Sequence, residues 1–372
     1  MSRLRILFML AAVLLFGSCS ISAATYAVGT CKPTLPSFLS ISAAVSSVPA
    51  GSTIEVCPGT YAEQVIISNP LTLEGISSGG SAQVVITVPG GGLPATSSLL
   101  GALSPQVLVE ATSGPVDITN ITVDGSAFVA NSCATILAGI YYDLNSSGTV
   151  DQVTIRNEIN SVCGFGILAE GGTANELLTI ENSSIHAFDY VGIWFDSIQL
   201  PDALTAIIKN NYIEGGITGI YINAGVLGSV TGNLVTSASQ TAIFAGSSVP
   251  ISSNTVTNSQ AGIWIQQAPG ISVITNKLSN NYVGIEFFES SGITVKSNTI
   301  LKSYIGIEFD CNAGNTVSGN VINDATTGLD LVPSGSTSSD AFLNVATIRS
   351  AGCAAARPAA KSPPTPFNHR PN

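Results

Sequence analysis

The apolar positions of this chain follow a five-residue phrase: Gly, then Ile or Leu, then any residue, then an apolar residue, then any residue. Nine copies occupy residues 139–332, one of them with Ala242 in the first place. The last four begin 22 residues apart, and a second phrase, Ile or Val followed three residues later by Asn, precedes most copies by about twelve residues. Two short strands in each repeat of 20 to 27 residues are typical of a solenoid.

Side chains alternate along a strand, so the second and fourth places of the phrase should point inward and the third and fifth outward. Coils stacked about 4.8 Å apart align these outward residues into two ladders, which we expect to face solvent. The third-place ladder comprises Tyr141, Leu168, Trp194, Tyr221, Phe244, Trp264, Glu286, Glu308 and Asp330. The fifth-place ladder comprises Asp143, Glu170, Asp196, Asn223, Gly246, Gln266, Phe288, Asp310 and Val332.

The N-terminal part predicts a capped first coil. Residues 37–48 place apolar side chains at helical spacing before Pro49, which predicts a short cap helix over the open end of the solenoid. Residues 52–75 read as three short alternating strands, one full coil. The run 43–75 resembles the opening of right-handed parallel β-helix proteins of the pectin-lyase-like superfamily. The later phrases resemble the repeats of that superfamily, including those of NosD-type proteins, so the likeness covers roughly residues 37–340. It implies an all-β, single-stranded right-handed parallel β-helix.

The segments outside the repeats complete the expected domain organisation. Residues 1–24, with Arg3 and Arg5 before an apolar run, are typical of a secretory signal peptide, and lipid anchoring at Cys19 is the less favoured alternative. Eleven apolar residues are too few to span a bilayer, and we expect no transmembrane segment in the mature chain. The β-helix should occupy residues 25–353, with an inserted loop at about 89–106, and residues 354–372 are expected to be a disordered Pro-rich tail.

Charge and cysteine content narrow the class of protein. Removal of the signal peptide leaves 10 basic and 23 acidic residues, a net charge of −13, which argues against nucleic-acid binding. Six cysteines remain, and an even number in an oxidising compartment predicts disulfides. The repeat register favours a bridge across one coil between Cys133 and Cys163. Pairs Cys31 with Cys57 and Cys311 with Cys353 would tie the two ends.

The aromatic part of the ladders suits sugar rings, since apolar ring faces stack on aromatic side chains and hydroxyls find amide and carboxylate partners. The alternative is that aromatic residues are simply favoured on sheets and shield the neighbouring backbone, or that loops cover them. We therefore take the following as candidate substrate-binding residues for a polysaccharide or cell-surface glycan: Tyr141, Asp143, Trp194, Asp196, Tyr221, Asn223, Phe244, Trp264 and Gln266.

The acidic part of the ladders supplies candidate catalytic residues, Glu286, Glu308, Asp310, Asp330 and Lys302. The four acids are also candidate ligands of Ca²⁺, which prefers oxygen. In pectate-lyase-like enzymes, Ca²⁺ bridges carboxylates to an acidic sugar, and here only Lys302 is near as a base. A hydrolase would instead use two of the carboxylates. The alternative is a solvated acidic face. Motifs of polygalacturonases and pectin methylesterases are missing from the sequence.

Other polar residues carry weaker signals. The lone His186 of the repeats and His369 of the tail, with two Met in the signal peptide, offer no copper ligand cluster. An asparagine ladder, which comprises Asn211, Asn233, Asn254, Asn276, Asn298 and Asn320, is better explained by turn geometry and stacking than by function.

The leading functional hypothesis is therefore a secreted protein that binds a polysaccharide and, if it is an enzyme, acts as a polysaccharide lyase or glycoside hydrolase. The alternatives are a non-catalytic surface or matrix protein, an adhesin or spacer, and a NosD-like accessory factor.

Overall fold

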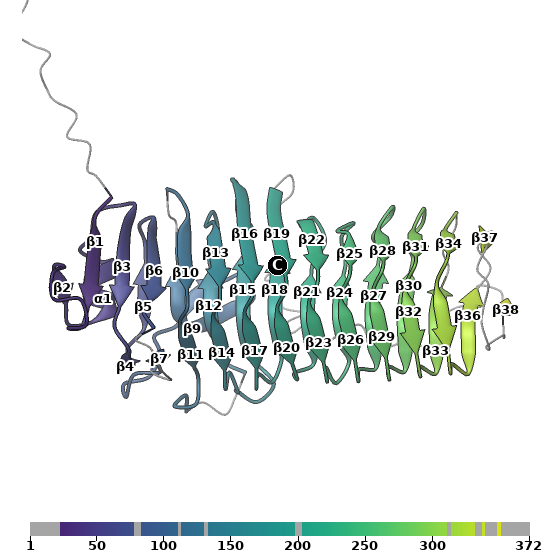
Figure 1. The fold of residues 1–372 in the computed structure, drawn as a ribbon, viewed down its shortest axis with the longest axis horizontal. Coiled ribbons are helices and arrows are strands. Elements are labelled where there is room, and N and C mark those ends of the chain that lie inside the picture. The colour runs from purple at the N-terminus through teal and green to yellow at the C-terminus, as the bar shows by residue number, and fades with distance from the viewer. Residues whose placement is uncertain are drawn as a thin grey trace, which may run out of the picture.

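The computed structural model describes residues 23–77, 83–110, 113–129, 133–197, 203–310, 314–331, 337–338 and 348–350. For residues 203, 310, 331, 337–338 and 348–350 it describes only the backbone. The described chain forms one long tube of stacked coils (Figure 1). Sheets A, B and C run along the tube, and almost all of their strands pair in parallel. The predicted all-β parallel β-helix is confirmed.

The strands of the described residues follow in stacking order. Sheet A contains β2 Ser37–Phe38, β1 Thr25–Val28, β3 Ser52–Val56, β6 Leu71–Gly75, β10 Val116–Thr119, β13 Gly148–Asp151, β16 Asn175–Glu181, β19 Ala203–Lys209, β22 Leu227–Thr231, β25 Ile251–Ser252, β28 Ser272–Ile274, β31 Thr294–Lys296, β34 Thr316–Ser318 and β37 Thr337–Ser338. Sheet B contains β4 Gly59–Ala62, β7 Val84–Thr87, β11 Thr122–Asp124, β14 Thr154–Arg156, β17 Ser184–His186, β20 Tyr212–Glu214, β23 Leu234–Thr236, β26 Thr255–Thr257, β29 Lys277–Ser279, β32 Thr299–Leu301 and β35 Val321–Asn323. Sheet C contains β5 Val65–Ile67, β9 Gly101–Val109, β12 Ile136–Tyr142, β15 Gly164–Glu170, β18 Val191–Asp196, β21 Thr218–Ile222, β24 Thr241–Ala245, β27 Ala261–Gln266, β30 Val283–Phe288, β33 Ile305–Asp310, β36 Thr327–Leu331 and β38 Ile348–Ser350, and β8 Thr96–Ser98 pairs with β9.

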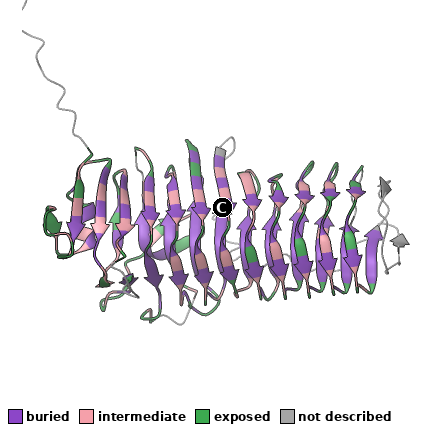
Figure 2. Ribbon diagram, in the orientation of Figure 1, coloured by how far each residue is buried: buried purple, intermediate pink, exposed green. Residues whose placement is uncertain are grey.

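The Gly-Ile phrase forms the strands of sheet C and fixes their register. Ile263, Ile285 and Ile307 pair with one another on successive coils and are fully buried. Buried residues line the whole length of the tube (Figure 2). A Cβ at Gly284 would lie 2.5 Å from the carbonyl oxygen of Gly306 and 2.7 Å from Cγ2 of Ile300. The first place of the phrase is therefore Gly because the next coil leaves no room for a side chain.

The asparagine ladder is structural, as expected, and it lies inside the tube. Asn276 is fully buried, and its Nδ2 donates to the carbonyl oxygen of Ile251 and to Oδ1 of Asn298, both at 3.0 Å. Its Oδ1 accepts the backbone N–H of Asn254 at 2.9 Å. The same pattern runs through the other ladder members. Each amide thus pairs with the coils on both sides.

The turn-geometry part of that expectation is wrong. Positive φ angles occur at the residue before each ladder asparagine, for example 56° at Thr275 and 57° at Ser297, and not at the ladder positions themselves. The ladder asparagines are selected for their inward hydrogen bonds, since the preceding residue makes the left-handed turn.

The N-terminal end is closed by strand β1 and by helix α1, Ile41–Val45, which buries Ile41, Ala44 and Val45. The two carboxylate oxygens of Glu63 accept the backbone N–H groups of Ile41 and Ser42 in the first turn of α1, at 2.9 and 2.8 Å. The helix is shorter than the 37–48 segment in which the sequence placed it, because residues 37–38 pair as β2. Within the expected loop 89–106, β8 and the start of β9 form an antiparallel hairpin.

The described residues contain two disulfides, Cys31 to Cys57 and Cys133 to Cys163, as the repeat register indicated. Residues Cys311 and Cys353, residues 1–22 of the expected signal peptide 1–24 with Cys19, and the tail 354–372 lie outside the described residues. Within the described part of the chain, no helix has the length and apolar character needed to cross a membrane.

Candidate functional site

The third-place ladder of sheet C aligns as predicted. Tyr141 pairs with Leu168, and the column continues without interruption through Trp194 and Trp264 to Asp330. The rings of Trp194 and Tyr221 stack with centroids 4.3 Å apart, and those of Tyr221 and Phe244 with centroids 4.4 Å apart. Trp264 meets Phe244 edge-on, so the aromatic column along the outside of the sheet is stacked from Trp194 to Phe244.

The expected solvent exposure of this stack is wrong. Tyr141, Trp194, Tyr221, Phe244 and Trp264 are buried, with at most 7% of any residue exposed. Each ring covers its neighbour, and apolar side chains that include Leu100 and Leu103 of the β8–β9 hairpin pack into the same cluster. This cluster is a second hydrophobic core, separate from the core inside the tube. The aromatic candidates are therefore structural residues in this conformation, and they do not offer open faces to a sugar.

Three carboxyl groups of the fifth-place ladder lie at the ends of β12, β15 and β18, together with the phenol of Tyr141 from the third-place ladder. Oη of Tyr141 lies 2.6 Å from Oδ1 of Asp143 and 2.7 Å from Oε2 of Glu170. Both carboxyl oxygens of Glu170 also accept the backbone N–H of Leu99 in the hairpin, at 3.1 and 3.0 Å. Glu170 pairs in register with Asp196 of the next coil. We call Tyr141, Asp143, Glu170 and Asp196 the acid cluster.

The acid cluster shares a proton. A phenol donates one hydrogen bond, yet Tyr141 Oη is within hydrogen-bonding distance of two carboxyl groups. Both contacts are hydrogen bonds when one carboxyl group is protonated and donates to Oη. Burial raises the pKa of Glu170 to about 7, helped by the charges of Asp196 and Asp143 and opposed by the hydrogen bonds from Leu99 and Tyr141. Glu170 therefore carries the proton in a large share of molecules near neutral pH.

The other polar residues in and around the acid cluster differ in their exposure to solvent. Asp196 is buried, and burial raises its pKa against the hydrogen bonds from Asn223 and Ser197. Asn223 Nδ2 donates to Asp196 Oδ1 at 2.7 Å. Asp143, Asn223 and, further along the ladder, Gln266 are half-buried. The acid cluster thus has a closed centre with a partly accessible polar rim.

The C-terminal acids of the third-place ladder lie on successive coils, as expected. Glu286, Glu308 and Asp330 pair in register on β30, β33 and β36, and Glu308 and Asp330 are buried. The side chain of Asp310 lies outside the described residues. Among the residues that the structure describes, no group of three or more His, Cys, Asp or Glu side chains is placed to hold a metal ion. Calcium binding by these acids stays a prediction.

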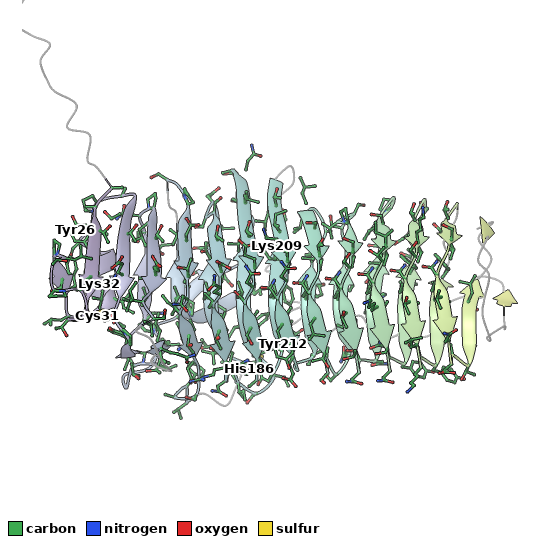
Figure 3. The ribbon with its side chains drawn as sticks, viewed as in Figure 1. Tyr26, Cys31, Lys32, His186, Lys209 and Tyr212 are labelled. Carbon is green, nitrogen blue, oxygen red and sulfur yellow. A yellow bond between two sulfur atoms is a disulfide. The ribbon has the colours of Figure 1, made fainter. Side chains whose placement is uncertain are left out.

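Lys302 lies in the exposed turn between β32 and β33, with a φ of 53° and its backbone N–H bonded to the carbonyl oxygen of Asn323. None of the salt bridges between described residues includes Lys302. His186 lies on β17 and pairs in register with Glu214 of β20 on the next coil, in the part of sheet B labelled in Figure 3. Its ring contacts Ser184 Oγ at 3.3 Å, consistent with the interpretation of a solitary side chain.

A further buried acid, Glu158, was not anticipated from the sequence. It is fully buried, and within the described residues neither of its carboxyl oxygens has a hydrogen-bond partner. Burial raises the pKa of Glu158 well above its ordinary value, and the charges of Asp124 and Asp189 add to this effect. Burial would also raise the pKa of Asp124, but hydrogen bonds from Asn157, Ser126 and Arg156 outweigh it and lower the pKa to about 2. Of the Glu158 and Asp124 carboxyl groups, Glu158 is therefore the one that favours the protonated, neutral form.

Glu170 was likewise not among the candidate site residues predicted from the sequence. Its place in the fifth-place ladder, between Asp143 and Asp196, was visible in the repeat register. Its hairpin partner Leu99 was not, because that contact joins residues 71 positions apart outside the repeat. A separate cavity, with a volume of ≈ 180 Å³, is lined by residues that include Gln83, Asn120 and Gln152, and it lies away from the acid cluster.

Comparison with known proteins supports the architecture. A family model described as a right-handed β-helix region matches residues 218–354. No curated protein sequence matches the chain significantly.

Solved structures with the same fold act on carbohydrates, according to their names. The A-module of the mannuronan C-5 epimerase AlgE4 from Azotobacter vinelandii has a TM-score of 0.53 at 16% identity, over 81% of this chain and 95% of that one. A lacto-N-biosidase from Eubacterium ramulus has a TM-score of 0.52 at 10% identity, over 86% of this chain and 67% of that one. The periplasmic alginate epimerase AlgG has a TM-score of 0.50 at 15% identity, over 81% of this chain and 70% of that one. At these identities the likeness shows the fold alone.

Proposed function

Because the chain is a right-handed parallel β-helix protein whose successive coils line up side chains along sheet C, we propose that it is a carbohydrate-active protein. It binds a polysaccharide and cleaves a glycosidic bond at the acid cluster. The observation that carries the proposal is the position of Tyr141 between Asp143 and Glu170, together with the raised pKa of about 7 at Glu170. A carboxylic acid that keeps its proton near neutral pH is what a glycosidase needs as a general acid.

The proposed roles follow from the positions of the side chains. Glu170 protonates the leaving oxygen, and Tyr141 holds the Glu170 carboxyl group in place through its hydroxyl. Asp196, one coil away, is the second carboxyl group. Adjacent coils lie about 4.8 Å apart, close to the roughly 5 Å spacing of carboxyl pairs in retaining glycosidases. Substrate would enter from the rim formed by Asp143 and Asn223, and the Leu99 hydrogen bonds would open to admit it.

The similar solved structures support the carbohydrate class, since a mannuronan epimerase, an alginate epimerase and a lacto-N-biosidase share the fold. We also propose secretion, with which the two disulfides are compatible. The coils that carry the acid cluster are therefore expected to work in an oxidising compartment.

A non-catalytic surface or matrix role is the second candidate. The closed state of the acid cluster favours it, because Glu170 and Asp196 are each only 2% exposed and Glu170 also anchors the hairpin. In that case the solenoid supplies length and rigidity, and the carboxyl groups serve packing alone.

The experiment is a turnover assay on a panel of neutral and uronate-containing polysaccharides, with and without Ca²⁺, that measures new reducing ends and unsaturated products. Cleavage by the wild type that is lost in Glu170→Gln and Asp196→Asn, but kept in the exposed control Glu214→Gln, supports the proposal. Calcium-dependent cleavage that survives Glu170→Gln would move the reaction to Glu286, Glu308 and Asp330. Cleavage of none of the polysaccharides leaves the surface or matrix role.

A further inference from the structure

A column of side chains runs along the turn between sheets B and C, at the residue before each of four successive sheet C strands. Its members are the half-buried Gln240 and the exposed Gln260, Tyr282 and Tyr304. Backbone hydrogen bonds fix the order: Val283 donates to the carbonyl oxygen of Gln260, and Ile305 donates to that of Tyr282, at 2.8 and 2.9 Å. The four side chains therefore occupy equivalent positions on successive coils.

The two tyrosine rings stack on each other and form one partly exposed aromatic patch. Their ring centroids are 4.9 Å apart and their planes meet at 9°. Tyr282 is 54% exposed and Tyr304 is 48% exposed, whereas every member of the third-place aromatic stack is buried. No hydrogen bond from either hydroxyl group to a described residue is present, so each phenol is available to a ligand. We call Tyr282 and Tyr304 the tyrosine platform.

The backbone holds the platform rigid. The turn residues two positions earlier, Asn280 and Lys302, have φ angles of 57° and 53°. Each donates its backbone N–H to the following coil, Asn280 to Leu301 at 3.1 Å and Lys302 to Asn323 at 3.0 Å. A binding surface that is already ordered loses little conformational entropy when it binds a ligand.

The surroundings of the platform supply polar partners. Gln260, Asn280 and Lys302 are exposed, and they supply an amide, a second amide and an ammonium group within the same column of turns. Lys302 has no salt bridge with any acid in the described part of the chain. Exposed aromatic surface flanked by amides and a cation matches a pyranose chain, whose ring faces are apolar and whose edges carry hydroxyl or carboxylate groups.

We propose that Tyr282 and Tyr304 form a second polysaccharide-binding surface, separate from the acid cluster. The proposal rests on the function proposed above for its class of ligand. Strand β30, which follows Tyr282, is five coils from β15, which carries Glu170, a separation of about 24 Å along the tube. A ligand that contacts both places must be a chain of several sugar units, so the platform favours longer chains over mono- and disaccharides.

The test is binding of the full chain to a neutral β-glucan and to a polyuronate, measured by affinity electrophoresis and calorimetry. The double variant Tyr282→Ala/Tyr304→Ala is expected to bind at least about tenfold more weakly, and Tyr282→Phe/Tyr304→Phe to retain binding. The matched control is Tyr212→Ala, since Tyr212 lies on sheet B and its hydroxyl donates a hydrogen bond to Glu214. Circular dichroism and thermal melting verify that each variant is folded.

Lys302→Asn distinguishes an acidic from a neutral polysaccharide ligand. It keeps the turn because Asn already occupies the equivalent position 280. Weaker binding to the polyuronate alone identifies an acidic polymer, and unchanged binding to both identifies stacking on neutral ring faces. Either result supports the platform, provided that the tyrosine double variant binds weakly.

Undiminished binding by the folded double variant overturns the platform, and so does a wild type that binds no polymer. The outcomes for the two proposals are separable. Loss of binding in the double variant, with turnover unaffected by Glu170→Gln, would leave the platform standing and remove the acid cluster as the reaction centre. Loss of turnover in Glu170→Gln with intact binding in the double variant would keep the acid cluster as the reaction centre and overturn the platform.

Discussion

The hydroxyl group of Tyr141 lies 2.7 Å from Oε2 of Glu170, on the neighbouring coil, with Leu99 of the hairpin bonded to the same carboxyl group. Buried hydrogen bonds of this kind tie a catalytic candidate to the stability of the fold. The ionisation of Glu170 should therefore be visible in unfolding experiments as well as in activity.

The first prediction concerns pH and Glu170. The pKa of Glu170 is raised from 4.5 to about 7, so the folded protein holds this proton at pH values where the unfolded chain has lost it. The resulting stabilisation is complete below about pH 4.5 and is lost as pH rises to about 7, with a slope of at most about 1.4 kcal/mol per pH unit. Denaturant unfolding at stepped pH should show Glu170→Gln lacking this contribution. Equal pH dependence in variant and wild type would contradict the raised pKa.

The second prediction concerns Glu158, whose pKa is raised well above its ordinary value. The same sign applies: the stabilisation from the neutral Glu158 is complete below about pH 4.5 and is lost as pH rises. Glu158→Gln should therefore unfold with a higher free energy than the wild type at pH 8 and with a similar free energy near pH 4. Urea unfolding at both pH values is the measurement, with Glu214→Gln as the exposed control. A variant less stable at pH 8 would show that the Glu158 carboxylate has a stabilising partner.

The third prediction concerns the asparagine ladder. Asn276→Ala removes three donated hydrogen bonds and leaves the buried N–H of Asn254 without an acceptor. We expect a loss of about 2–4 kcal/mol in the free energy of unfolding. Lys277→Ala, at the adjacent exposed position, should change it by less than about 0.5 kcal/mol. Comparable losses in the two variants would mean that the ladder does not stabilise the stack.

The fourth prediction separates the buried aromatic stack from the tyrosine platform. Tyr221 packs between Trp194 and Phe244, so Tyr221→Ala should cost about 3–5 kcal/mol of unfolding free energy through the cavity it leaves. Tyr282→Ala should cost much less, since more than half of Tyr282 is exposed. Thermal melting of both variants checks the order. A stable Tyr221→Ala protein would show that the outer core is dispensable.

The sequence predicted the fold because the repeat states its register directly. Gly284 and Gly306 recur at the step that brings their backbones into contact, and the isoleucines that follow them recur inside the tube. The column of Tyr141, Trp194 and Trp264 was predicted for the same reason. Periodicity within one strand tells which side chains share a face.

Burial of that outer face could not be predicted, because alternation along a strand distinguishes inside from outside and not covered from open. Leu100, Leu103 and the Leu99 contact to Glu170 come from the hairpin, which breaks the repeat and so has no register in the sequence. Tyr282 and Tyr304 were missed for a related reason. They precede the Gly-Ile phrase, in a turn to which the two ladders assign no position.

The head-to-tail direction of the asparagine ladder has an evolutionary consequence. From Asn211 to Asn298, each ladder amide accepts from the coil before it and donates to the coil after it, and Asn254, Asn276 and Asn298 do so with nearly equal distances. A 22-residue coil duplicated in tandem beside Asn276 would therefore meet the same partners on both sides. The tube can gain or lose whole coils without leaving an amide unpaired, so its length is free to vary among descendants of one gene while its ends stay the same.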